Sequence, residues 1–181
     1  MSRNLSPVKQ TTASGPATIK EEIRQNRPFS SRHEEAAISL MRTADLIRRL
    51  VGTVVEPHDI TIQQYNVLRI LRGAGEQGLP TLEIAERMIE QTPGITRLID
   101  RLEHKKLVDR QRCDEDRRRV WCRITASGLS LLASLDEPVR ESIGSLATLN
   151  ARDLTQLVEH LDRARAGVHA ALHTINERKG R

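Results

Sequence analysis

The chain has 181 residues, which suits one compact domain with appendages and excludes two large independent domains. Apolar residues make up 38% of it and charged residues 29%, and Phe29, Tyr65 and Trp121 are the only aromatic residues, so we expect a mostly helical, aliphatic core. The net charge of +5 indicates a polyanionic partner. We expect a cytoplasmic protein without a membrane span, because the two cysteines lack C-x-x-C spacing and the chain has no long apolar run.

Positive charge is concentrated in two segments. Residues 92–123 carry ten Lys and Arg against six Asp and Glu, and residues 1–32 carry six against two. Each segment therefore carries a surplus of four positive charges. Residues 1–30 are rich in Ser, Thr and Pro and contain few large apolar side chains, so we expect a flexible basic arm with a short helix over residues 19–24.

Two helices follow the arm. Ser31 and Glu34 have the spacing of a capping box, and apolar residues then recur every three or four positions, which predicts a long helix over residues 31–56 that ends before Pro57. Thr61 and Gln64 repeat the capping pattern and predict a second helix. Glycines at positions 73, 75 and 78 mark its end.

Two shorter helices come next. The third is expected to begin after Thr81 and to turn Leu82, Ala85 and Met88 toward the core. Thr92 is expected to cap the fourth, with Pro93 in its first helical position, where the missing N–H costs nothing.

The fourth helix has two different faces. Its apolar residues predict a buried face and are Ile95, Leu98, Ile99 and Leu102. The residues left outward are small at the start of the helix and charged after it: Gly94, Thr96, Arg97, Asp100 and Arg101. This outward face could approach a DNA groove closely, with Arg97 and Arg101 reaching guanine edges or phosphates. The alternative is that both arginines are ordinary solvated helix charges.

The pattern changes to that of strands between residues 107 and 125. Alternation of apolar and polar residues over 120–124, behind the charged segment 114–118, predicts a two-stranded hairpin with a charged tip. Asp116 and Arg118 are two positions apart, so the carboxylate can orient the guanidinium for entry into a minor groove. A surface salt bridge of little energetic value is the alternative for this pair. A helix pair followed by such a hairpin is typical of a duplex-DNA reader.

Two helices complete the chain. The first passes through Leu129, Leu132 and Leu135, with a kink expected at Pro138, and the second is capped by Asn150. The last helix carries an apolar stripe of about seven turns, more than a domain of this size needs to cover itself. A second copy of the chain would cover it, although an antiparallel pair within one chain would satisfy the same pattern.

The segment LPTLEIAERMIEQTPGITRLIDRLEHKKLVDRQR, followed by DEDRRRVWCRITASG, resembles the MarR family of winged helix-turn-helix regulators. The resemblance implies a mainly α (α+β) fold with long N- and C-terminal dimerisation helices over about 31–56 and 126–175. It places a DNA-binding lobe at about 61–125, within a domain of residues 31–175. The chain departs from the family at Lys106, where a glycine often ends the recognition helix. A left-handed lysine would cost about 1 kcal/mol relative to glycine.

What the resemblance implies about partners is a homodimer that binds a pseudo-palindromic duplex operator, as a repressor whose affinity for DNA an aromatic acid can alter. Tyr65 and Arg42 are the candidates for binding such an effector. The DNA-binding candidates come from the recognition helix, the residues before it and the tip of the hairpin, or wing: Thr92, Pro93, Gly94, Thr96, Arg97, Arg101, Asp116, Arg117 and Arg118.

No pattern points to catalysis, a cofactor or a metal. His169 and His173 share a helix face but lack the H-E-x-x-H arrangement, so surface histidines are the better interpretation. Cys113 and Cys122 lie on opposite strands of the hairpin, where a redox role stays open, but buried core cysteines are favoured. Two other functions remain: a winged-helix module that binds protein, and the dimerisation domain of a methyltransferase, for which no glycine-rich cofactor segment is present.

Overall fold

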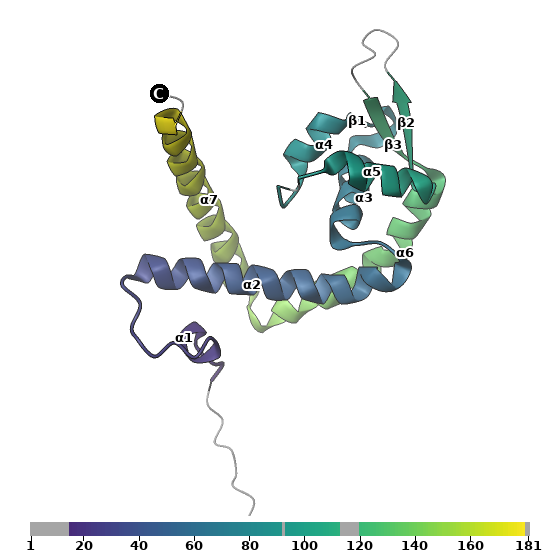
Figure 1. Ribbon diagram of the computed structural model, residues 1–181. Coiled ribbons are helices and arrows are strands. Elements are labelled where there is room, and N and C mark those ends of the chain that lie inside the picture. The colour runs from purple at the N-terminus through teal and green to yellow at the C-terminus, as the bar shows by residue number, and fades with distance from the viewer. Residues whose placement is uncertain (1–14, 92, 113–119, 180–181) are drawn as a thin grey trace, which may run out of the picture. The chain divides into compact units, whose positions relative to one another are not determined.

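The computed structural model describes residues 15–91, 93–112 and 120–179, which are mostly helical with one small antiparallel sheet (Figure 1). The chain divides into two compact units, residues 1–49 and 50–181. In the first unit, Thr18 caps the short helix α1 (Ile19–Glu22) through a complete capping box. The side chain of Arg42, on the longer helix α2 (Arg32–Val55), pairs with Glu22 at 2.7 Å and so ties the two helices together.

The predicted start and end of α2 are largely confirmed. The backbone N–H of Glu34 donates to the Ser31 hydroxyl at 3.2 Å, as a cap requires. In a complete capping box, the Glu34 carboxylate would accept from the backbone N–H of Ser31. Here it accepts instead from the backbone N–H of Ser30, at 2.6 Å. The helix ends at Val55, and Pro57 lies in the 3-10 turn η1 (Glu56–His58), where proline cannot continue an α-helix.

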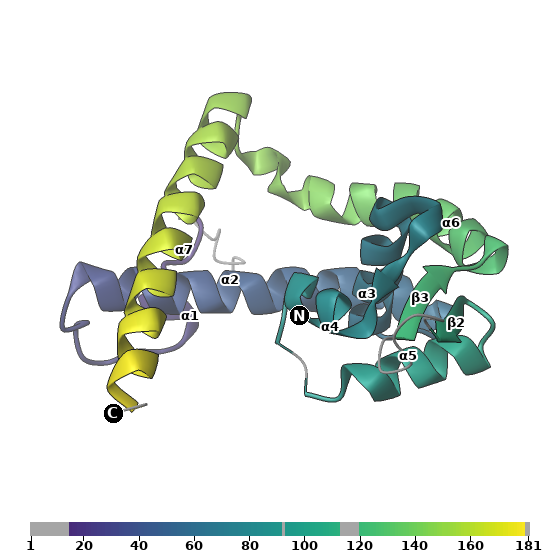
Figure 2. The same ribbon diagram turned by 90° about the horizontal axis from the view of Figure 1, so that it is seen from above.

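The second unit contains a lobe of three helices and three strands, which Figures 1 and 2 show gathered together. Its helices are α3 (Ile62–Ala74), α4 (Thr81–Arg87) and α5 (Ile95–His104). The predicted capping box of α3 is confirmed, because Gln64 N–H donates to the Thr61 hydroxyl at 3.2 Å and Thr61 N–H donates to the Gln64 side chain at 3.0 Å. The 3-10 turn η2 (Gly75–Gln77) follows α3.

The sheet has the order β1-β3-β2 and is antiparallel throughout. Strands β2 (Val108–Arg112) and β3 (Val120–Ile124) form the predicted hairpin, with Val108 opposite Ile124. The sequence did not predict β1 (Leu79–Pro80), whose Leu79 lies opposite Cys122. A strand of two residues is too short to show the alternation of apolar and polar residues by which strands are predicted, and β1 is recognised only from its pairing with β3.

Side chains from the three helices of the lobe, from β2 and β3, from the end of α2 and from α6 (Ala126–Ile143) meet in its core. The fully buried residues are Val55, Val67, Leu68, Leu71, Ile84, Ile99, Leu102, Val108, Cys122, Leu132 and Leu135. The prediction that Leu82 turns inward is wrong, because Leu82 is 72% exposed and Ile84 is the fully buried residue of α4. Helix α4 follows directly on β1, so strand pairing fixes its rotation and points Ile84 at the core.

The C-terminal end of α5 is held by a left-handed lysine. Lys106 has a φ of 57°, its N–H donates to the Glu103 carbonyl at 2.8 Å, and the N–H of Leu107 donates to the Leu102 carbonyl at 2.9 Å. These two bonds form a Schellman motif, in which glycine is the favoured left-handed residue. Lysine thus takes the left-handed position in which the family often has glycine.

The same junction explains the Thr-x-x-Gly pattern that opens α6. The Thr125 hydroxyl donates to the Lys106 carbonyl at 2.8 Å and accepts from the Gly128 N–H at 3.0 Å, so one side chain caps α6 and holds the end of α5. A Cβ at Gly128 would lie 2.4 Å from the Leu107 carbonyl oxygen. Only glycine lets α6 approach the backbone this closely.

The remaining helices lie at the C-terminal end. Helix α6 continues through Pro138 to Ile143 and is followed by η3 (Gly144–Thr148) and α7 (Ala151–Lys179). Asn150 caps α7 as predicted, since its side-chain oxygen accepts from the Asp153 N–H at 3.0 Å. No residue of α7 is buried by the described residues, so its apolar stripe is exposed to solvent in this part of the chain.

Substituting Gly128 by alanine should destabilise the protein by about 1–3 kcal/mol, because the added methyl group overlaps a backbone oxygen. Urea unfolding would measure the loss. The matched control is Gly73→Ala in α3, where a Cβ would have no atom within 4 Å, and a gain of about 0.5–1 kcal/mol is expected there. Equal effects of the two substitutions would contradict the close approach at Gly128.

Substituting Lys106 by glycine should stabilise the protein by about 1 kcal/mol, because glycine adopts the left-handed conformation without a Cβ penalty. The thermal midpoint should rise. Gly94→Ala is the converse test. Gly94 has a φ of 92° and open space around it, so alanine would be strained there without a steric clash, and the thermal midpoint of this variant should fall. A lower midpoint for Lys106→Gly would show that the lysine side chain has a structural role of its own.

Candidate nucleic-acid interface

The start of α5 differs from the prediction. Helix α5 begins at Ile95, its N-cap is Gly94 in the left-handed conformation, and no side chain caps it. Pro93 therefore lies in the turn before the helix and not in its first position, while Thr92 lies outside the described residues. The cause is local: Gly94 can adopt a φ of 92°, so the chain turns there, and its carbonyl accepts from the Arg97 N–H at 2.9 Å.

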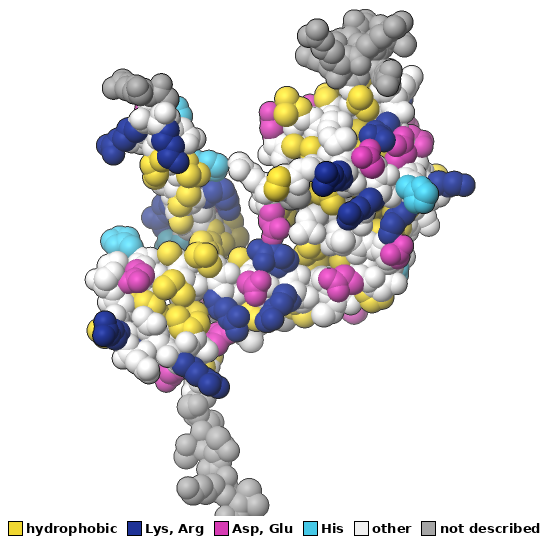
Figure 3. Space-filling view, in the orientation of Figure 1, with side chains coloured by type: hydrophobic (Ala, Val, Ile, Leu, Met, Phe, Trp, Pro, Cys, Tyr) yellow, Lys and Arg dark blue, Asp and Glu magenta, His cyan; other side chains and the backbone are white. Residues whose placement is uncertain are grey.

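The predicted division of α5 into two faces is confirmed. Ile99 and Leu102 are fully buried, and Ile95 and Leu98 are half-buried. The outward residues Gly94, Thr96, Arg97, Asp100 and Arg101 are all exposed. Packing of the apolar face thus fixes which side chains the helix presents to solvent, and Figure 3 shows Lys and Arg side chains on the surface of this lobe.

Strand β2 is joined to α5 by an arginine. Arg110 donates from Nε to the Glu103 carboxylate at 2.8 Å, also contacts Glu103 through Nη2, and pairs from Nη1 with Asp100 at 2.7 Å. The hydrogen bond to Glu103 raises the pKa of Arg110 above its ordinary value. Sequence reasoning missed this cluster, because it links a helix to a strand and follows no periodic spacing.

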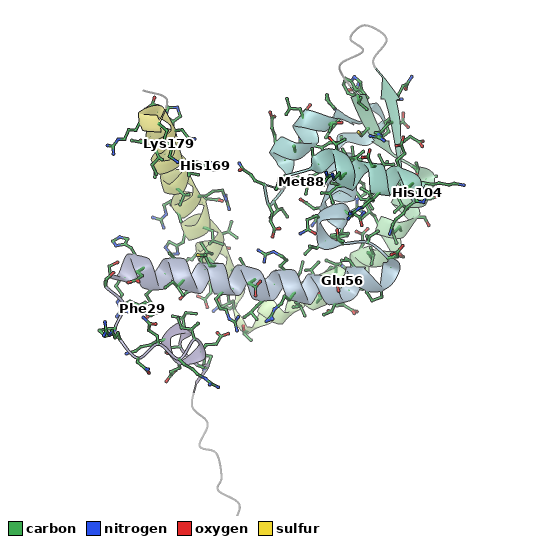
Figure 4. All side chains as sticks on the ribbon, viewed as in Figure 1. Phe29, Glu56, Met88, His104, His169 and Lys179 are labelled. Atoms are coloured by element: carbon green, nitrogen blue, oxygen red, sulfur yellow. The ribbon has the colours of Figure 1, made fainter. Side chains whose placement is uncertain are left out.

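The residue that follows α5 is also tied to the residue that follows η1. Lys105 pairs with the Asp59 carboxylate at 2.6 Å and contacts the Asp59 carbonyl as well. A shallow hollow of about 310 Å³ lies here and is lined by Glu56, Asp59, Ile60, Thr61, Gln64, Arg101 and Lys105. Figure 4 labels Glu56, and His104 at the end of α5.

Two arginines remain available on the outward face of α5. Within residues 15–91, 93–112 and 120–179, neither Arg97 nor Arg101 forms an ion pair, in contrast to Lys105 and Arg110. Arg97 and Arg101 are four positions apart, about one helical turn, so their guanidinium groups can act on neighbouring anionic groups. The arrangement is suited to binding the edge and backbone of a nucleic-acid duplex.

The tip of the hairpin lies outside the described residues. Asp116, Arg117 and Arg118 fall in the segment between β2 and β3, as does Cys113, so their proposed roles stay predictions. The hairpin is described up to the pair formed by Arg112 and Val120.

The environment of Cys122 supports the interpretation of a core cysteine. Its side chain is fully buried on β3, and burial raises the pKa of the thiol above its ordinary value. The Thr81 hydroxyl lies 3.6 Å from its sulfur atom. A buried thiol with a raised pKa holds little of the reactive thiolate, so Cys122 has the properties of a small apolar residue.

The two weak effector candidates lie in different units. Tyr65 on α3 is only 5% exposed, and the Arg69 guanidinium stacks 5.8 Å from the centre of its ring. Arg42 belongs to the first unit, where its carboxylate partner is Glu22. Sequence reasoning missed Arg69, although its i+4 spacing from Tyr65 is a detectable signal.

The described part of the chain contains neither a metal-binding cluster nor a helix that could span a membrane. No group of three or more His, Cys, Asp or Glu side chains there could hold a metal ion, and His173 is instead 3.5 Å from Glu177. No helix among the described residues is long and apolar enough to cross a bilayer.

Comparison with known proteins agrees with this geometry. Residues 60–120 match the model of the MarR family. The chain is 26% identical over 147 residues to the HTH-type transcriptional regulator FarR of Neisseria gonorrhoeae, which covers 81% of this chain and 99% of FarR. The structure of NadR in complex with 4-hydroxyphenylacetate has a TM-score of 0.63 and 26% identity, covering 77% of this chain and 98% of NadR.

The crystal structure of a MarR transcription factor from Planctomyces limnophilus gives the strongest family assignment of these. Its sequence is 40% identical, with a TM-score of 0.58, and the match covers 75% of this chain and 98% of that protein. The helical lobe with its three-stranded sheet is therefore the winged helix-turn-helix fold that the sequence predicts, and the chain belongs to the MarR family of transcriptional regulators.

Proposed function

We propose that this regulator binds a pseudo-palindromic duplex operator as a homodimer, represses transcription, and releases DNA in response to an aromatic acid. The observation that carries the proposal is the outward face of α5, where Arg97 and Arg101 are exposed and form no ion pair with a described residue. We assign a non-enzymatic, cytoplasmic role to the chain, because a transcriptional regulator of this family acts on the chromosome.

The contact with DNA is assigned to α5 in the major groove. Thr96 and Gly94 leave the first turn of the helix small, so the backbone can approach the groove, and the two arginines then reach guanine edges or phosphates. Thr92 and Pro93 precede this turn and are assigned to the same contact. Asp116, Arg117 and Arg118 are assigned to the wing, with the carboxylate orienting an arginine for the minor groove.

The homodimer is assigned to the long helices. Helix α7 buries none of its residues, and its exposed large apolar side chains are Leu157, Val158, Val168, Leu172 and Ile175. On α2, the large apolar residues Leu40, Met41 and Leu46 are also exposed. Apolar stripes of this length are stable in water when another helix covers them, and a second copy of the chain supplies matching stripes.

The chemical class of the effector is inferred from the ligand of a structural relative and from the side chains that this chain offers. NadR, a structural relative at 26% identity, has been crystallised with 4-hydroxyphenylacetate, an aromatic acid. Within the second unit, Tyr65 with Arg69 over its ring is the candidate contact for an aromatic ring. Within the first unit, Arg42 is the candidate contact for a carboxylate.

A module that binds protein instead of DNA is the competing function. Such a module would be expected to present an apolar recognition face, whereas the outward face of α5 is polar and cationic. That face supports the DNA reader.

Substituting Arg97 by alanine should relax the sequence preference of DNA binding and cost about 1–3 kcal/mol, because a bidentate contact with a base edge is lost. Arg118→Ala should instead weaken binding uniformly across sequences. Selection of bound fragments from genomic DNA would measure both effects. Arg178→Ala, at the far end of α7, is the control and should leave binding unchanged. Unaltered selection by both test variants would refute the site assignment.

Substituting Leu172 by glutamate should dissociate the dimer, because a carboxylate would be buried in an apolar interface. Light scattering after gel filtration should then report a monomer with at least about a tenfold loss in operator affinity. Arg163→Glu introduces the same side chain on α7 outside the apolar stripe, and it should remain dimeric. A wild-type protein that is monomeric at micromolar concentration would contradict the assignment.

A further inference from the structure

Asp100 occupies a conspicuous position on α5. It lies between Arg97 and Arg101 on the outward face, and its side chain is 48% exposed. A carboxylate among the arginines that we assign to DNA would repel the phosphate backbone if it were free to point toward it. The interface therefore needs a group that controls where this carboxylate lies.

Arg110 is that group. Its guanidinium contacts both Asp100 and Glu103, which are one turn apart on α5, through different nitrogen atoms. The Arg110 side chain is only 27% exposed, so it is held at the junction of helix and strand. Its Cα lies opposite that of the buried Cys122 in the sheet, which anchors the strand from which it projects.

We propose that Arg110 is a positioning residue of the DNA interface, which draws the Asp100 carboxylate toward β2 and away from bound phosphates. The inference rests on the proposed function, because it concerns the same interface. With Arg110 present, the cluster with Asp100 and Glu103 carries one net negative charge. Without it, the cluster carries two, and Asp100 loses its partner.

A purely mechanical brace between α5 and β2 would behave differently. Glu103 accepts from two nitrogens of Arg110 and Asp100 pairs with one, so a brace would depend on Glu103 at least as much as on Asp100. Control of the Asp100 charge depends on Asp100 alone. Two double variants with the same net charge therefore separate the two roles.

The test compares Arg110→Met with two double variants, Arg110→Met with Asp100→Asn and Arg110→Met with Glu103→Gln. Affinity for a duplex fragment selected by the wild-type protein is measured by fluorescence anisotropy at fixed salt. Arg110→Met should weaken binding about tenfold, since an unpaired carboxylate then faces the phosphates. Adding Asp100→Asn should restore affinity to within about threefold of wild type, whereas adding Glu103→Gln should not.

Arg72→Met is the matched structural control. Arg72 on α3 donates to both carboxylate oxygens of Asp136 on α6, at 2.8 and 3.0 Å, so this variant also breaks an arginine–carboxylate pair between two elements. Its DNA affinity should stay within about twofold of wild type, because the pair involves neither α5 nor the wing. Circular dichroism checks the folding of every variant.

Several results would overturn the inference. They are unchanged binding by Arg110→Met, equal restoration by both double variants, and restoration by neither. If Arg110→Met does not fold, Arg110→Lys replaces it, since lysine keeps one charge but lacks the guanidinium fork. The loss of affinity should then be smaller and again reversed only by Asp100→Asn.

A wild-type protein without salt-sensitive DNA binding would refute the proposed function and the inference with it, whereas wild-type binding with unaffected variants would refute the inference alone.

Discussion

The interface depends on how the backbone is held where α5 meets β2. Lys106 turns the chain in a left-handed conformation, and Thr125 holds its carbonyl while capping α6. Gly128 lets α6 approach the Leu107 carbonyl closely. With this junction fixed, Ile99 and Leu102 enter the core, and the opposite face of α5 is directed to solvent. The ion pairs of Arg110 then join α5 to β2, the first strand of the hairpin.

Charges are distributed over this element in two classes. Lys105 and Arg110 are bound to carboxylates, whereas Arg97 and Arg101 form no ion pair with a described residue. The positive charge of residues 92–123 is thus only partly available to a partner. Net charge alone predicts a polyanionic ligand, but the ion pairs determine which side chains can bind it.

Local patterns predicted most of the fold. Capping residues located the starts of α2, α3 and α7, period-four spacing separated the faces of α5, and alternation located the hairpin. The errors occurred where tertiary contacts overrule local preference. Pairing of β1 with β3 sets the rotation of α4 and exposes Leu82, and the left-handed Gly94 moves the start of α5 beyond Pro93. The cluster around Arg110 joins residues of different elements, so no spacing rule could identify it.

Among the described residues, the apolar stripe of α7 and the cationic face of α5 are both exposed to solvent. We assign the stripe of α7 to a second copy of the chain and the face of α5 to a DNA duplex. If α5 lies in the major groove, bound protein should shield guanine N7, which dimethyl sulfate methylates there, so footprinting with this reagent tests the assignment directly. We expect two protected guanine clusters about 10 bp apart on a selected fragment. Binding that protects no guanine N7, or only one asymmetric cluster, would contradict it.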